Sequence, residues 1–284
     1  MADAYAFLHQ QHQTLTTLCS GEAWSEESLH DYRVCLRRLQ VAWPLLELLT
    51  PECPTQRNRI GRQLKASNRA RDSQVLLTQL QQLSAPAKLI ARLQAEQVAA
   101  KPVSPAWLKG LVEALALGCW RWEQVADHHG SCKALLLLQH RLYLHLVSKL
   151  VERLNRPQRA RQAKRWHRLR VAIKRLRYLL EWLVTLDARW QSDLRTLKGW
   201  QERLGNISDL AMLHDWLHQR HLRRQPGAKR LLKQVCEQQQ ACQQQAFEQL
   251  PLLRQFLQQA QAQPEAAELR GAVGSCADSD AAAP

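Results

Sequence analysis

Residues that break helices are scarce in this 284-residue sequence, which contains 10 Gly and 11 Pro. Aromatic residues make up only 6% of it, and no segment alternates apolar and polar residues for long enough to predict a sheet. No run of about 18 apolar residues exists, so we expect no membrane-spanning helix. Leu, Gln, Ala and Arg, which are good helix formers, dominate the rest. These absences argue against β-sandwiches, Rossmann folds and TIM barrels, and they predict an all-α protein.

The eight cysteines include no Cys-x-x-Cys pair, and their spacing is irregular. A disulfide framework is not expected in a chain that is long enough to bury a sizeable core. The first Lys or Arg is Arg33, so the N-terminal segment lacks the positive region of a signal peptide. We therefore expect reduced thiols and a cytoplasmic location.

Negative charge is in short supply, because 40 Lys and Arg stand against 25 Asp and Glu, for a net charge of +15. Residues 153–177 contain eleven Lys or Arg and no acid, and residues 57–71 contain six and again no acid. A solvated surface normally mixes both signs. The imbalance points to a polyanionic partner such as nucleic acid, polyphosphate or an anionic membrane surface, with a plain basic face as the alternative.

Helical periodicity extends over most of the chain and ends near residue 262. We interpret residues 1–262 as one helical domain, with half-repeats at about 1–129 and 130–262, and residues 263–284 as a disordered tail. Pro251 is expected to open a last short helix. The other predicted helices lie at about 3–18, 25–50, 56–83, 86–99, 104–127, 131–155, 158–186, 189–204 and 208–222, with another beginning after Gly227.

The second half repeats the first at a fixed offset of 137 residues, which is 167 − 30. The segments 29–39 and 166–176 share His, Arg, Val, Arg and Leu at matching positions. The same offset aligns Asp72 with Asp209 without a gap. The repeat therefore predicts that each half forms a bundle of about four helices. Two such halves are expected to pack about a pseudo-twofold axis.

The repeated helix carries its cations on one face. His167, Arg170 and Lys174 share a helical face, and the leucines of this segment lie on the opposite side. His30, Arg33 and Arg37 form the equivalent stripe in the first half. Like charges three and four residues apart repel by a few tenths of a kcal/mol per pair. An anion that bridges the stripes would offset this repulsion.

These residues resemble the CHAD family, the "conserved histidine α-helical domain". The resemblance rests on His-x-x-Arg-Val-x-x-x-[Arg/Lys]-Arg-Leu in both halves and on Leu204-Gly205-Asn206-Ile207-Ser208-Asp209, and it covers about residues 1–260. It implies two pseudo-symmetric four-helix bundles around a basic central pore, binding of inorganic polyphosphate, and association with polyphosphate granules. It further suggests a CYTH-type triphosphatase or another polyphosphate-metabolising enzyme as a partner, although this chain has no Glu-x-Glu-x-Lys signature of its own.

By position, the resemblance places nine residues on the pore: His30, Arg33, Arg37, Arg38, His167, Arg170, Lys174, Arg175 and Arg177. The charge pattern adds Arg62, Lys65 and Arg69, which share a helical face by their spacing. The first half departs from the family pattern. Gln40 stands at the position equivalent to Arg177, and Ser67-Asn68 stand where Leu204-Gly205 do, so binding is expected to be stronger on the second half.

No motif of hydrolysis or nucleotide binding is present, so we expect no catalytic residue, no cofactor and no metal site. His214, His218 and His221 share a helical face and form the best metal candidate, but one helix rarely supplies a full ligand set. Three alternatives remain: a nucleic-acid-binding protein, an enzyme acting on phosphate compounds, and an adaptor that brings a partner to granules. The sequence lacks a helix-turn-helix and an aromatic RNA platform. We expect no membrane partner.

Overall fold

The computed structural model describes residues 2–20, 25–49, 56–96, 105–126, 129–155, 162–219 and 222–262. These residues contain α-helices, one short 3₁₀ helix and no strand, which confirms that the fold is all-α. The predicted tail at 263–284 lies outside them. In chain order the helices are α1 (Ala2–Ser20), α2 (Glu26–Leu49), α3 (Arg57–Ala66), α4 (Asn68–Gln82), α5 (Ala87–Glu96), α6 (Pro105–Ala126), α7 (His129–Asn155), α8 (Gln162–Leu186), η1 (Ala188–Trp190), α9 (Gln191–Leu217) and α10 (Ala228–Ala262).

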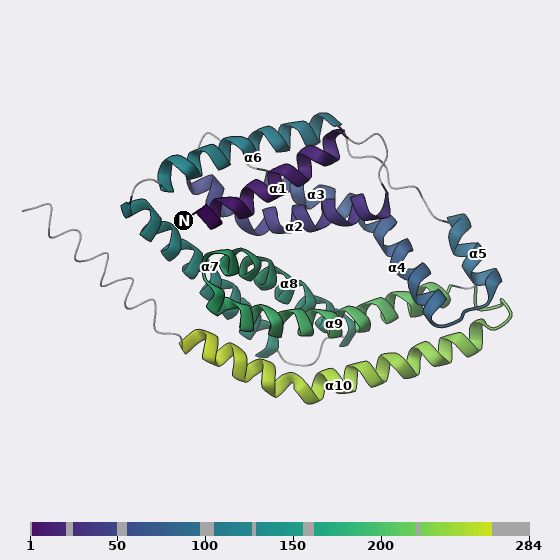
Figure 1. The fold of residues 1–284 in the computed structure, drawn as a ribbon. Helices are drawn as coiled ribbons and strands as arrows, with labels where there is room; N and C mark the ends of the chain where they lie inside the picture. The colour runs from purple at the N-terminus through teal and green to yellow at the C-terminus, as the bar shows by residue number, and fades with distance from the viewer. Residues whose placement is uncertain are drawn as a thin grey trace, which may run out of the picture.

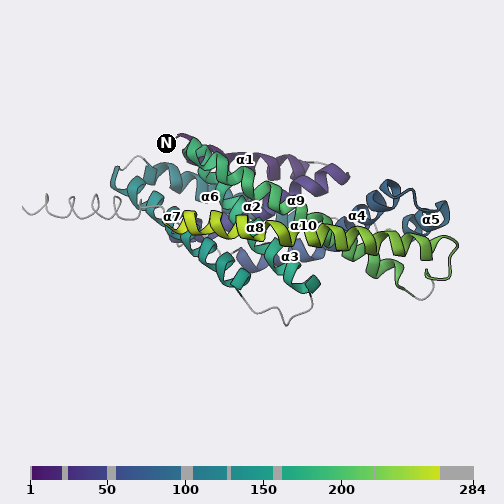
Figure 2. The same cartoon turned by 90° about the horizontal axis from the view of Figure 1, so that it is seen from below.

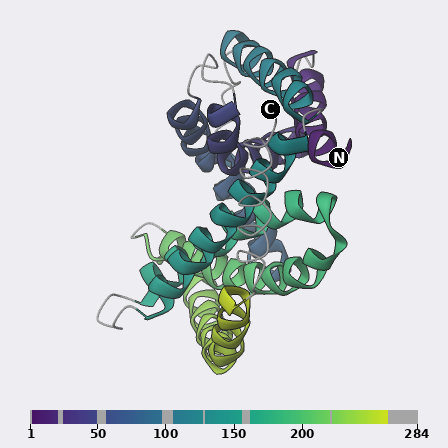
Figure 3. The same ribbon diagram turned by 90° about the vertical axis from the view of Figure 1, so that its left-hand side faces the viewer.

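The helices form two groups that meet along α8. In the N-terminal group (α1, α2, α3 and α6), α1 packs against α2 and α6, and α2 packs against α3. In the C-terminal group (α7, α8, α9 and α10), α8 packs against α7 and α9, and α10 covers α9 and α7. Both α1 and α2 contact α8, so this helix joins the groups (Figures 1 and 3). Within the described residues, no helix is long and apolar enough to cross a bilayer.

Two apolar clusters hold this arrangement together. The larger one contains Trp43 of α2 and Trp182 of α8, both almost fully buried, and it spans both helix groups. The smaller one lies where α4 and α5 meet the end of α9 and the start of α10, at one end of the elongated molecule (Figure 2). Burying a large apolar side chain contributes about 1.5–3 kcal/mol. The two clusters therefore fix the relative positions of α2, α8 and α9, on which the predicted site residues lie.

The start of α2 confirms the predicted helix boundary at Ser25. The Ser28 backbone N–H donates to Ser25 Oγ at 3.0 Å, and Glu26 and Glu27 occupy the first turn. A serine cap satisfies a backbone N–H that has no partner within the helix, and acidic residues are favoured by the helix dipole.

Three predicted boundaries in the second part of the chain are wrong. The separate helices at 189–204 and 208–222 are one helix, α9, which continues through Gly205. Leu204 and Ile207 are buried on its core face, and their packing outweighs the roughly 1 kcal/mol that glycine costs in a helix. Pro251 does not open a helix but lies inside α10, where the neighbouring Leu250 is anchored in the core.

The opposite error occurs in the first half, where one helix was predicted over 56–83. The structure divides this segment at Ser67 into α3 and α4. A side chain from α2 explains the break, because Arg33 donates to the Leu64 carbonyl at 3.1 Å and to Ser67 Oγ. At a helix end the last carbonyls lose their partners within the helix, and Arg33 supplies a donor to one of them, the Leu64 carbonyl.

Candidate anion-binding site

Basic side chains from both helix groups converge where α8 meets α2. We define the central cation cluster as six basic residues, each of which interacts electrostatically with at least one other member. They are Arg33, Arg37, Arg71, Arg170, Lys174 and Arg177. They come from α2, α4 and α8. This is the convergence that the two repeated stripes led us to expect, since the cationic faces of α2 and α8 lie toward each other.

Arg33 is the most enclosed of these cations, with only 6% of its surface exposed. Besides the bonds at the α3–α4 junction, it donates to Asn68 Oδ1 at 2.9 Å. Burial, followed by the charge of the nearby Arg37, lowers the pKa of Arg33 to about 10. Ser67 and Asn68, which depart from the family pattern, are thus the groups that hold Arg33. Arg33 therefore connects α2 to the α3–α4 junction.

Arg170, the equivalent residue on α8, lies over α9. Its Nη2 is 3.6 Å from Asp209 Oδ1, and a Cβ built at Gly205 would lie 3.8 Å from the same nitrogen. Burial lowers the pKa of Arg170 although Asp209 opposes that shift. Burial also raises the pKa of the Asp209 carboxyl, against the effect of Arg170 and Lys174. The Arg170 Nε is buried and has no hydrogen-bond partner among the described residues, so the guanidinium is only partly satisfied.

Arg38 and Arg177 share one carboxylate. Glu181 of α8 accepts from Arg38 Nε at 2.9 Å and lies 2.7 Å from Arg177 Nη1. Phe7 of α1 stacks on Trp182 beside this bridge, with ring centroids 5.5 Å apart. The bridge therefore crosses from α2 to α8 and neutralises part of two predicted cations. It connects the two helix groups as much as it contributes to an anion site.

Lys174, Arg37 and Arg71 differ from these paired residues. Among the residues that the structure describes, no carboxylate lies within ion-pair distance of any of the three. Burial, followed by the charges of Arg37 and Arg170, lowers the pKa of Lys174 to about 6, although Asp209 opposes the shift. Cations held together without neutralising partners repel one another, more strongly than in water because water is partly excluded. An entering anion would relieve that repulsion.

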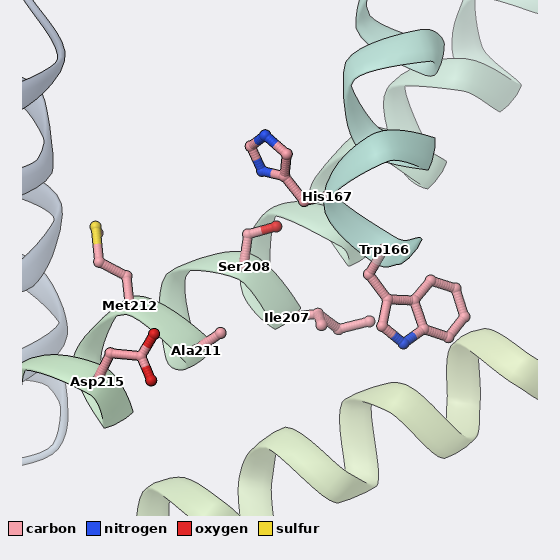
Figure 4. A pocket seen from close by; sticks show the side chains of 7 residues that line it. All are labelled: Trp166, His167, Ile207, Ser208, Ala211, Met212 and Asp215. Atoms are coloured by element: carbon pink, nitrogen blue, oxygen red, sulfur yellow. The ribbon is translucent and has the colours of Figure 1, made fainter. Parts of the chain in front are cut away.

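The remaining predicted residues are exposed: His30, Arg62, Lys65, Arg69, His167 and Arg175. Burial of the ring, followed by Arg170 and Lys174, lowers the pKa of His167, which places this histidine beside the cluster. His167 also lines a pocket of about 260 Å³ between α8 and α9, together with Ser208 and Asp215 (Figure 4). The charges that shift the pKa values of Arg33, Arg170 and Lys174 do not include Arg62, Lys65 or Arg69.

Arg71 and Asp72 are the site residues that the sequence argument missed. Arg71 interacts with Arg33 and Arg170, and Asp72 with the same two residues. The helical spacing used to group Arg62 with Arg69 assumed one continuous helix, and the break at Ser67 changes which side chains face α2. A signal was nevertheless present, because Asp72 aligns with Asp209 at the repeat offset.

The histidines at the end of α9 do not form a metal centre in the described part of the chain. His214 and His218 stack with ring centroids 4.9 Å apart, and His214 Nδ1 lies 3.3 Å from Asp215 Oδ1. No group of three or more potential ligands gathers among the described residues. His221, the third predicted member, lies outside them.

Comparison with known proteins identifies the family. The CHAD domain family matches residues 6–218, and because this is most of the chain, the protein belongs to that family. Among solved structures, the chain is similar to the CHAD domain from the plant Ricinus communis, with 26% sequence identity and a TM-score of 0.58. The alignment covers 90% of this chain and 91% of that one. No curated protein shows significant similarity. The predicted family is thus confirmed.

Proposed function

We propose that this CHAD protein is a non-enzymatic binding protein for inorganic polyphosphate, and that the polyanion enters the central cation cluster. The observation that carries the proposal is the set of cations without carboxylate partners among the described residues: Arg37, Arg71 and Lys174, which all interact with Arg170. They come from three helices, and none of them forms an ion pair with a described carboxylate. An anion that reaches all three would replace repulsion by charge-assisted hydrogen bonds.

The chemistry of the cluster favours phosphate groups in a narrow chain. A guanidinium presents a planar fork of donors that matches phosphate oxygens. Each unit of polyphosphate offers such oxygens and nothing bulkier. Nucleic acid would also bring bases, which single-strand-binding proteins stack on exposed aromatic rings. Trp166 and Trp182 lie on α8, which carries three of the cluster's cations, but both rings are buried and offer no such surface. This difference supports polyphosphate over nucleic acid.

We further propose that the two helix groups are pseudo-symmetric bundles around a basic central pore. The helix boundaries support this proposal. A shift of 137 residues moves α2, at 26–49, onto 163–186, next to α8 at 162–186. The same shift pairs Arg33 with Arg170 and Asp72 with Asp209. Asp72 interacts with both arginines, and Asp209 lies beside Arg170. A duplicated cation–carboxylate arrangement would present phosphate contacts from two sides.

Such a pore would let the protein attach to polyphosphate granules and bring a partner enzyme to them. The basic residues outside the cluster, including His30, Arg62, Lys65 and Arg69, would then contact phosphates on the way into the pore. Their exposure fits this role, since loosely held cations contribute mainly by releasing counterions from the polyanion. Affinity should therefore fall steeply with salt and rise with polyphosphate length.

A direct titration tests the proposal. The full chain is titrated with long-chain polyphosphate and with single-stranded DNA at matched phosphate concentration and several salt concentrations. We expect tight, salt-sensitive binding of polyphosphate and weaker binding of DNA. Equal affinity for both would favour the nucleic-acid alternative. Absence of polyphosphate binding at low salt would refute the proposal.

Two variants and one control locate the site. Arg170→Ala and Lys174→Ala should each weaken binding about tenfold or more, since hydrogen bonds to charged groups contribute about 1.5–3 kcal/mol. Arg195→Ala, which removes an exposed cation of α9, should have little effect. Circular dichroism verifies that each variant is folded. Release of phosphate in the presence of Mg²⁺, abolished by His167→Ala, would instead support an enzyme.

A further inference from the structure

Lys174 has an unusual position for an ammonium group. It lies on α8, half-buried, at the place where this helix contacts α2 and α9. Its neighbours along α8 are Arg170 and Arg177, and Arg37 faces it from α2. Among the described residues it makes no ion pair. A charge at this position is thus separated from water and placed among other positive charges, both of which disfavour the protonated amine.

The charges around Lys174 can be followed helix by helix. Arg170, Arg177 and His167 are near on α8 itself, and Arg37 is near on α2. Among the described residues, Asp209 of α9 is the charge that opposes them. That carboxylate is already 3.6 Å from Arg170 Nη2. No charged group from α1, α7 or η1 is among the described residues that act on Lys174. The surroundings therefore remain net positive until an anion arrives.

The equivalent residue in the first half is Arg37, because 37 + 137 = 174. An arginine stays protonated at any physiological pH, whereas a lysine releases its proton readily when it is buried. The repeat carries an arginine at one of these positions and a lysine at the other. The half that carries the lysine therefore has a protonation equilibrium near neutral pH, and the half that carries the arginine does not. Burial and Arg37 lower the pKa of Lys174 to about 6, which agrees with this reading.

We propose that Lys174 is neutral in the free protein and takes up one proton from the buffer when polyphosphate enters the cation cluster. This inference rests on the proposed function and adds a pH-dependent step to it. The phosphate oxygens supply the negative charge that Asp209 alone does not, so the ammonium form becomes the favoured one. Binding then couples to pH, and the protein holds polyphosphate more tightly in a mildly acidic medium than in an alkaline one.

The size of the effect follows from proton linkage. At pH 7.5 an amine with a pKa near 6 is protonated in roughly 3% of molecules, so full protonation on binding takes up nearly one proton. Above pH 6 the affinity then falls by up to about tenfold for each pH unit. His167 lies beside the cluster, and bound phosphate would also raise its pKa, so its share of the proton uptake is measured with a separate variant.

The test is calorimetric titration of the full chain with long-chain inorganic polyphosphate at pH 7.5, in two buffers with different ionisation enthalpies. The difference in observed enthalpy gives the number of protons taken up. We expect nearly one for the wild type and almost none for Lys174→Arg, whose affinity should no longer change between pH 7 and 8.5. Lys198→Arg, an exposed lysine of α9, serves as the matched control and should behave like the wild type. His167→Gln measures any contribution of the histidine.

The outcomes separate the two proposals. Absence of polyphosphate binding overturns both. Binding with no proton uptake, or with the same uptake in Lys174→Arg, overturns only the proton-coupled step. If Lys174→Arg does not fold, ¹³C-labelled lysine in the wild type replaces it. We expect one Cε signal that titrates near pH 6 in the free protein and not in the complex. If every lysine of the free protein titrates near pH 10, the inference is wrong.

Discussion

Replacing Glu181 by Gln tests whether the bridge from α2 to α8 holds the two helix groups together. Glu181 is the shared partner of Arg38 and Arg177, at 2.9 and 2.7 Å. The substitution keeps the shape of the side chain and removes its charge. Two cations, one from each helix group, would then lie close together without a neutralising partner.

The magnitude follows from how enclosed the bridge is. The side chains of Glu181, Arg177 and Arg38 are 12%, 13% and 27% exposed. Breaking a fully buried ion pair costs about 3–5 kcal/mol, whereas an exposed pair contributes about 0.2–1 kcal/mol. A mostly enclosed bridge lies between these limits, so Glu181→Gln should lower the free energy of unfolding by about 2 kcal/mol.

Urea unfolding followed by circular dichroism measures this change. Glu237→Gln is the matched control, since Lys233 and Glu237 also form a pair four residues apart, but at 3.8 Å and largely exposed. It should cost less than about 0.5 kcal/mol. A Glu181→Gln loss no greater than that of the control would refute the reasoning. The same variant should still bind polyphosphate, because it removes no cation from the cluster.

Three further predictions concern the core, the salt dependence and the pH dependence. Trp182→Ala, which removes a buried ring stacked on Phe7, should lower the free energy of unfolding by about 3–5 kcal/mol in the same urea assay; a loss below 1 kcal/mol would contradict the assigned core. Arg37→Ala should reduce the slope of log affinity for polyphosphate against log salt by about 0.7, and a slope equal to that of the wild type would place Arg37 outside the site. Without ligand, the unfolded chain holds a proton on Lys174 that the folded chain releases above pH 6, so the free energy of unfolding should rise with pH from about 6 toward about 10. Lys174→Met should lose part of this rise, and an unchanged pH profile would contradict the lowered pKa.

The sequence was a good guide wherever one residue pattern controlled one helix. The cap at Ser25 and the stripe formed by Arg170 and Lys174 follow from local spacing, so both could be predicted. The family also followed from the sequence, because its motif occurs twice. The boundaries at Ser67, Gly205 and Pro251 could not be predicted, since side chains from other helices decide whether the chain continues or breaks there.

The site shows the same division. Spacing along α2 and α8 identifies the cations but not their partners. That Glu181 neutralises Arg38 and Arg177, while Lys174 remains without a carboxylate among the described residues, depends on how α2 and α9 pack against α8. Arg71 was missed for a related reason, because the break at Ser67, where Arg33 contacts the chain, separates α4 from α3 and changes which side chains share a face.

By itself, the amino-acid sequence determined that this chain is helical, that it is duplicated, and that it carries rows of cations opposite its apolar faces. These properties depend on residues that are near neighbours along the chain, so periodicity reveals them. Only the tertiary structure decided which cations are paired, which are enclosed, and which remain without a carboxylate partner among the described residues. Charge interactions and burial depend on distances between helices, and those distances are set by packing of the whole molecule.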